Sequence, residues 1–245
     1  MMWDMFGPVH IVSLVLAAII IAALYFVLRK CSEKVQTNVL FVLSFWGIAA
    51  ILWDLIWGDC LLENLPLHLC SVNAMLLPIT VKTKNKRLGN LLLLWCLGAL
   101  IALLLPYDLQ EEPVVAWHSF FYFFPHVVEF GIPLLLIWLG HIKKDWRCIG
   151  STMLVTLVIY TGIHFINTAI NSYCLAHQVL NAQGNIISVN YIFTQYPNNG
   201  LVELFYKVIP VPYWYMFLAF PIILIYLVAL YVPQILQERK KQKVV

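Results

Sequence analysis

The stretch VHIVSLVLAAIIIAALYFVL, residues Val9–Leu28, decides the fold of this chain. It contains no Asp, Glu, Lys or Arg, and Arg29 and Lys30 follow it directly. A helix that crosses the hydrocarbon core of a bilayer needs ~20 mostly apolar residues, which this stretch supplies. A secretory signal starts with basic residues, whereas the only charged side chain before this stretch is Asp4. We therefore expect a retained membrane-spanning helix.

The rest of the 245-residue chain has the same apolar character. Hydrophobic residues make up 62% and charged residues 11% of it, and the mean hydropathy is +0.85. Soluble domains carry roughly 25% charged residues, so lipid must solvate most of this chain. No Lys/Arg patch is interleaved with aromatics, which predicts no nucleic-acid partner. We expect spans over residues 9–28, 38–58, 65–81, 88–105, 114–140, 148–171 and 212–235.

The breaks between these spans alternate in charge. Four breaks hold 14 of the 15 Lys and Arg residues: 29–34, 82–87, 143–147 and 239–243. The other set has Lys207 as its only cation and contains Asp4, Asp59, Glu63, Asp108, Glu111, Glu112 and Glu203. Basic loops stay in the cytoplasm during insertion. The pattern predicts an all-α polytopic protein with seven helices in a single domain over residues 1–245, the N-terminus outside and the C-terminus cytoplasmic.

Two segments depart from plain spans and loops. Segment 65–81 offers about 17 residues, or ~25 Å, against a hydrocarbon core of ~30 Å. Its Leu65–Pro66 start fits the first turn of a helix, so its outer end is expected to be recessed. The outer stretch 172–211 is long, and loops of that length are typical of lids or binding loops. We expect it to pack against the membrane face.

Polar residues from three spans fall at a similar depth in the outer half of the membrane. They are His68 and Cys70 on 65–81, His118, His126 and Glu129 on 114–140, and His164, Asn167 and Asn171 on 148–171. On the sixth span the three residues recur at i, i+3 and i+7, which is one helix face. On the fifth, the three fall within an arc of about 80° at 100° per residue. Ionisable residues at membrane depth are costly, so this agreement predicts a functional site.

Cys70 and the histidines define the candidate chemistry. A Cys near a helix start and beside histidines has the surroundings of a nucleophile, although a Cys in a membrane helix often serves only packing. His126 with Glu129 one turn on requires a partner if both are buried. The chain has no Cys-x-x-Cys, His-x-x-x-His or His-Glu-x-x-His run, and we predict no metal and no cofactor. Cys60 and Cys174 both fall outside the spans, and whether they pair stays open.

Three sequence motifs carry a family resemblance. They are Leu65-Pro66-Leu67-His68-Leu69-Cys70-Ser71, Phe123-Phe124-Pro125-His126 and Asn190-Tyr191. With these motifs the chain resembles the YwaF-like bacterial integral membrane proteins over nearly its whole length. That family is similar to an animal transmembrane acyltransferase that makes polyunsaturated ether phospholipids with a Cys nucleophile. The resemblance implies Cys70 as nucleophile, His126 as base, and a place in the bacterial plasma membrane.

The predicted function is therefore transfer of a fatty acyl group between phospholipid and lysophospholipid through a Cys thioester. The expected catalytic residues are Cys70, His126, His68 and His164. The expected substrate-binding residues are His118, Glu129, Asn73, Asn167, Asn171, Asn190 and Tyr191. The alternatives are a lipid hydrolase, either His-based or metal-dependent through His68, His118, His126, His164 and Glu129, and a seven-helix receptor or carrier. The sequence leaves the donor, the acceptor and the oligomeric state open.

Overall fold

The structure, a computed structural model, describes residues 2–109 and 113–242, and in that part the regular secondary structure is helical. Glu111, Glu112 and Lys243, which entered the charge pattern, lie outside the described residues. Within the described part, six helices are long and apolar enough to cross a membrane, and one shorter apolar helix accompanies them. The prediction of an all-α polytopic membrane protein is confirmed.

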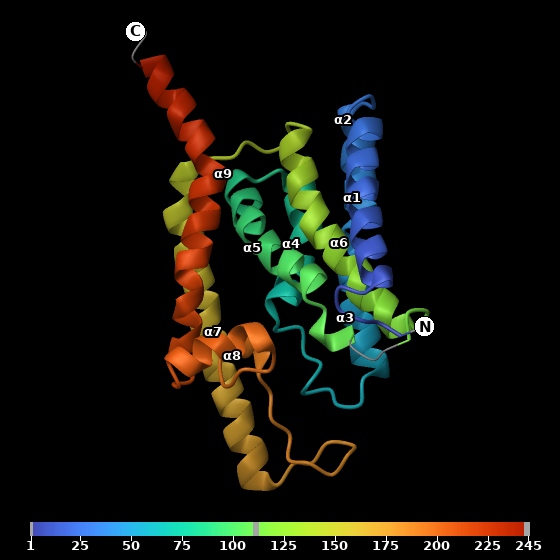
Figure 1. Cartoon of the computed structure of the whole chain (residues 1–245), viewed down its shortest axis with the longest axis vertical. Coiled ribbons are helices and arrows are strands. Elements are labelled where there is room, and N and C mark those ends of the chain that lie inside the picture. The colour runs from blue at the N-terminus through green and yellow to red at the C-terminus, as the bar shows by residue number, and fades with distance from the viewer. Residues whose placement is uncertain (1, 110–112, 243–245) are drawn as a thin grey trace. The chain divides into compact units, whose positions relative to one another are not determined.

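The helices follow the predicted spans in order (Figure 1). Five boundaries differ from the predicted ones by four residues or more. The second span starts at residue 33 instead of 38, the third starts at 69 instead of 65, the sixth ends at 177 instead of 171, and the seventh runs over 219–242 instead of 212–235. The helices are α1 Pro8–Leu28, α2 Glu33–Leu43, α3 Phe45–Trp57, α4 Leu69–Thr83, α5 Lys86–Leu104, α6 Trp117–Trp138, α7 Ile149–His177, α8 Gly200–Val208 and α9 Ala219–Gln242.

The chain divides into two compact units, which we describe separately. The first unit is Met1–Trp57 with Leu69–Lys143, and the second is Gly58–His68 with Lys144–Val245. In the first unit α5 is the central helix, because it packs against both α4 and α6 and most of its side chains are buried. α4 also contacts α2, α3 and α6, while α1 lies along α6 (Figure 1).

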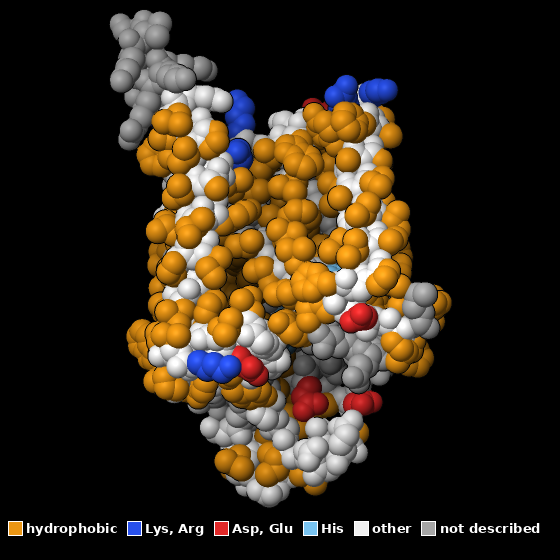
Figure 2. Space-filling model, viewed as in Figure 1, with side chains coloured by type: hydrophobic (Ala, Val, Ile, Leu, Met, Phe, Trp, Pro, Cys, Tyr) orange, Lys and Arg blue, Asp and Glu red, His pale blue; other side chains and the backbone are white. Residues whose placement is uncertain are grey.

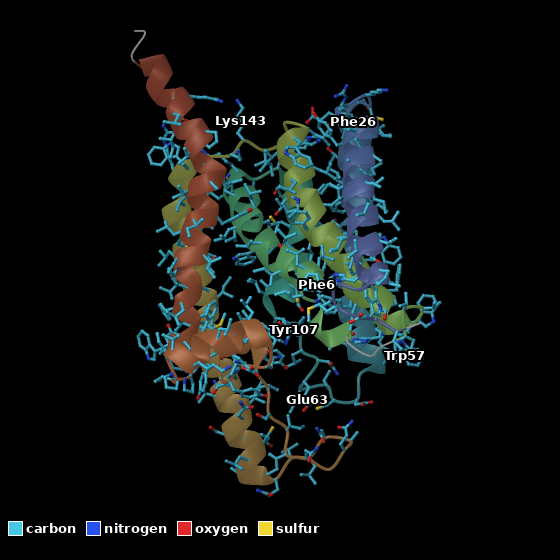
Figure 3. All side chains as sticks on the ribbon, in the orientation of Figure 1. Phe6, Phe26, Trp57, Glu63, Tyr107 and Lys143 are labelled. Carbon is cyan, nitrogen blue, oxygen red and sulfur yellow. The ribbon has the colours of Figure 1, made fainter. Side chains whose placement is uncertain are left out.

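The surface of the first unit fits a lipid environment. The free flank of α1 exposes apolar side chains such as Ile11, Val15 and Ile19. Figure 2 shows hydrophobic side chains along α1, with Lys and Arg side chains gathered at its upper end. Phe26 and Lys143 lie at this upper end of the unit, whereas Phe6 and Trp57 lie lower (Figure 3). The first unit therefore has an apolar flank and one basic end, as expected of a membrane-crossing bundle.

The second unit is built on α7, α9 and the segments between them. Its apolar core contains Ile163, Cys174, Ile187, Val189 and Tyr191. The stretch 172–211 is more ordered than a plain loop, because it includes the end of α7 and the short helix α8. Asn199 caps α8 by accepting a hydrogen bond from the Val202 N–H, which satisfies one of the free donors of the first turn.

Candidate functional site

Cys70 lies in the first turn of α4. The helix begins at Leu69, so the expectation that Pro66 occupies the first helical turn is wrong. Residues 60–67 instead form turns, closed by bonds such as Asn64 N–H to the Cys60 carbonyl at 3.1 Å. The free N–H groups and the dipole of a helix start favour negative charge, which suits a thiolate. His68 precedes the helix.

A buried polar pair lies one turn further along α4, where Asn73 meets Glu129 of α6. Asn73 is 1% exposed and Glu129 is 3% exposed. Asn73 Nδ2 donates to Glu129 Oε2 at 3.3 Å, which joins α4 to α6. Within the part of the chain that the structure describes, Asn73 Oδ1 is buried without a hydrogen-bond partner. A buried polar atom of this kind calls for a physical explanation.

Cys70 and His126 have the same sequence spacing from the two bonded residues. Helices α4 and α6 run in the same direction (Figure 1). Cys70 is three residues before Asn73, and His126 is three residues before Glu129. Each is therefore about one turn earlier on its helix, and a common site of the two side chains stays a prediction. The Cys70 thiol also contacts the Ser71 hydroxyl and lies within electrostatic range of Glu129.

The His126 ring is oriented by its own helix. Its Nδ1 lies 2.6 Å from the Tyr122 carbonyl, and a carbonyl can only accept a hydrogen bond. The proton of a neutral His126 is therefore on Nδ1, which leaves the lone pair on Nε2. This is the tautomer that a general base needs. His118 lies two turns earlier on α6; it is exposed and interacts with Asp54 of α3.

In the second unit, His68 is held by a turn of the segment after α7. Its ring meets Tyr191 edge-on at 5.2 Å and Phe193 at 6.1 Å between centroids. The Ile192 N–H donates to His68 Nδ1 at 3.5 Å. The Tyr191 hydroxyl donates to the Leu62 carbonyl, which ties the same turn to the segment before His68.

Asn167 and Asn171 of α7 bind the backbone of this segment. Asn167 Nδ2 donates to the Tyr191 carbonyl at 2.9 Å, and its Oδ1 accepts from the Tyr191 N–H at 3.2 Å. Asn171 makes the same two bonds with Val189, at 2.9 and 2.7 Å. Each side-chain amide thus clamps the backbone of one residue with two hydrogen bonds. Their contacts indicate that they position the segment, and a role in binding substrate stays a prediction.

The turn that the clamps hold is strained. Ile192 and Phe193 have φ of 52° and 55°, in the left-handed region. Such backbone costs about 1–3 kcal/mol per residue and persists only where surrounding contacts enforce it. Asn190 Oδ1 accepts from the Gln195 N–H at 2.9 Å, and the Tyr215 hydroxyl donates to the Phe193 carbonyl. Asn190 and Tyr191 are therefore parts of a turn that several side-chain hydrogen bonds hold in place.

His164 lies one turn before the Asn167 clamp. Its Nδ1 is 3.3 Å from Gln195 Nε2, and its ring is 4.9 Å from that of Tyr213. Cys70 and His126 belong to the first unit and His164 to the second. A cavity shared by all three therefore stays a prediction.

The structure bears on the metal-dependent alternative and on the state of the cysteines. In that part of the chain, no three His, Cys, Asp or Glu side chains gather as a candidate metal site. All six cysteines are free thiols. Cys60 packs against the core cluster that contains the buried Cys174. The sequence left open whether Cys60 and Cys174 pair, and the structure shows each as a free thiol.

We compared the chain with models of known protein families. Residues 5–231 match the TMEM164 family, a span that includes every candidate residue above. The chain belongs to the TMEM164 family. Comparisons with curated proteins and with solved structures gave no significant match. Membership of the TMEM164 family supports a multi-pass membrane protein, while the narrower YwaF-like resemblance and a bacterial cell membrane stay predictions.

Proposed function

We propose that this TMEM164-family protein is a membrane-embedded acyltransferase that moves a fatty acyl group from a phospholipid to a lysophospholipid. Cys70 is the nucleophile and His126 the general base. The observation that carries this proposal is the register of α4 and α6: the Asn73–Glu129 bond supports placing Cys70 and His126 at one level. The Nδ1–H tautomer of His126 leaves Nε2 as a proton acceptor.

The reaction has two half-steps. In the first, His126 Nε2 takes the Cys70 proton, and the thiolate attacks the ester carbonyl of the donor. The ester C–O bond breaks, the lysophospholipid leaves with the proton from His126, and a Cys70 thioester remains. In the second, His126 removes the proton from the hydroxyl of the acceptor, which attacks the thioester. The new ester forms, and the proton returns to the Cys70 sulfur.

The position of Cys70 also supports stabilisation of the intermediate. The first N–H groups of a helix have no partner within it and point toward its start. Donors of this kind stabilise the oxyanion that forms when a carbonyl is attacked. A site within an apolar bundle also restricts water, which would otherwise hydrolyse the thioester.

The test is acyl transfer by purified protein in liposomes. These contain a phospholipid with a labelled acyl chain and a lysophospholipid acceptor. Cys70→Ser replaces the thiol by a much weaker nucleophile, so transfer should nearly vanish while membrane yield stays normal. His126→Gln should lower the rate by about 10²-fold or more. Mass spectrometry of the native protein should detect an acyl adduct on Cys70.

Cys96→Ser is the matched control. Cys96 is buried in α5, where its Sγ contacts the Leu93 carbonyl at 3.1 Å, so it tests packing without the proposed chemistry. Its substitution should leave transfer nearly unchanged. Full transfer by Cys70→Ser would disprove the thiol mechanism. Release of labelled free fatty acid without transfer would instead identify a hydrolase.

A further inference from the structure

The Asn73–Glu129 pair has a second feature beyond its register. Glu129 is 3% exposed on a membrane-spanning helix. Among the described residues, its side chain accepts a hydrogen bond from the neutral Asn73 amide, and none of the ion pairs there includes it. An ionised carboxylate at such a position is expensive unless a cation or several donors compensate it. The surroundings of Glu129 therefore favour a neutral group.

The unbonded carbonyl oxygen of the Asn73 side chain also favours a neutral, protonated Glu129. Its Nδ2 donates to Glu129 Oε2, while its Oδ1 is buried without a donor among the described residues. A carboxylic acid and a primary amide are complementary at two points. The acid carbonyl accepts from the amide N–H, and the acid O–H donates to the amide carbonyl. A proton on Glu129 Oε1 would complete that pair.

We propose that Glu129 is protonated in the folded protein and forms a two-point acid–amide pair with Asn73, which positions Cys70 relative to His126. The positioning part rests on the proposed function, whereas the protonation does not. Two hydrogen bonds fix the relative rotation of α4 and α6 more tightly than one. Neutrality matters as well, because Cys70 lies within electrostatic range of Glu129. A carboxylate there would oppose the Cys70 thiolate, and a carboxylic acid does not.

Infrared difference spectroscopy of the full-length protein in lipid tests the protonation directly. The native protein minus Glu129→Gln should show the C=O stretch of a carboxylic acid, shifted down in D₂O. Cys70→Ser should keep this band. Asp54→Asn is the control for a second carboxyl group on a membrane-spanning helix and should keep it too. If the difference spectrum shows carboxylate bands and no acid band, Glu129 is ionised and the proposal is wrong.

Activity and stability test the positioning. Gln at position 129 can still form two hydrogen bonds with Asn73, so Glu129→Gln should keep acyl transfer within about threefold of native. Glu129→Ala and Asn73→Ala leave a buried partner unsatisfied and should lower transfer by at least about tenfold. A loss in Glu129→Gln as large as in Glu129→Ala would overturn the positioning role. If Cys70→Ser remains active, the proposed function fails, yet the infrared result still decides the state of Glu129.

Discussion

At the scale of single residues, His141 shows how burial controls charge in this molecule. It lies between α6 and α7, and its side chain is 2% exposed. Its Nδ1 is 3.8 Å from Glu33 Oε1, and Glu33 also pairs with Lys84. Burial lowers the pKa of His141 below its usual value, Lys84 acts in the same direction, and Glu33 opposes both.

This lowered pKa predicts a pH-dependent stability. A His in the unfolded chain titrates near pH ~6.5. Below that pH the unfolded state binds a proton that folded His141 does not, so stability should fall as the pH drops toward the folded pKa. Thermal unfolding in detergent at a series of pH values should show this loss. His141→Gln, which cannot take up the proton, should flatten the slope, and an unchanged slope in that variant would contradict the role of His141.

The candidate residues show how far sequence reasoning reaches. Motif and depth identified Cys70, His126 and Glu129 as candidates, and the structure places all three on α4 and α6. Contacts between distant positions were not predictable. The Asn167 clamp on Tyr191 joins residues 24 apart in sequence through a strained turn. A left-handed Ile192 has no sequence signal, because only the surrounding contacts enforce it.

At the scale of helices, α3 and α4 approach each other closely at Gly47. A Cβ atom at Gly47 would lie 2.5 Å from the Ala74 Cβ and 3.4 Å from Glu129 Oε1. Small residues allow such close backbone approach between membrane helices. The absence of a side chain at Gly47 therefore lets α3 pack beside the buried Asn73–Glu129 pair.

Gly47→Ala should consequently destabilise the protein. Forcing a methyl group into this contact is expected to cost about 1–3 kcal/mol. Gly98→Ala is the matched control in the same unit, because a Cβ there would meet only Leu69 Cδ2 at 3.7 Å, an ordinary contact. Thermal unfolding of both variants in one detergent measures the difference. Equal midpoints would refute the close contact at Gly47.

The helix boundaries were predictable only in part. Apolar length located the spans, because the bilayer sets that length. The break between α2 and α3 was not predicted. At this break the Ser44 hydroxyl donates a hydrogen bond to the Phe41 carbonyl at 2.6 Å, and hydrogen bonds of this kind often bend helices. The start of α4 at Leu69 was also missed, because packing of Leu65 and Leu67 against the core of the second unit is a tertiary effect.

At the scale of the whole molecule, charge and apolar surface together give the topology. The basic breaks alternate with acidic ones along the sequence. Within the first unit the structure adds an independent observation, since Lys143 lies at the same end as Phe26, the end where Lys and Arg side chains gather (Figures 2 and 3). That end should face the cytoplasm.

Site-directed cysteine labelling in intact cells tests this orientation. In a cysteine-free background, Ala182→Cys should react with a membrane-impermeant maleimide, because residue 182 is exposed in the segment after α7. Arg87 is also exposed, at the start of α5, and Arg87→Cys should react only after the cells are opened. The physical reason is the cost of moving four clustered cations, Lys82, Lys84, Lys86 and Arg87, across the bilayer. Labelling of Arg87→Cys in intact cells would reverse the orientation, which would move Cys70 and His126 to the inner leaflet and require the lipid substrates to be sought there.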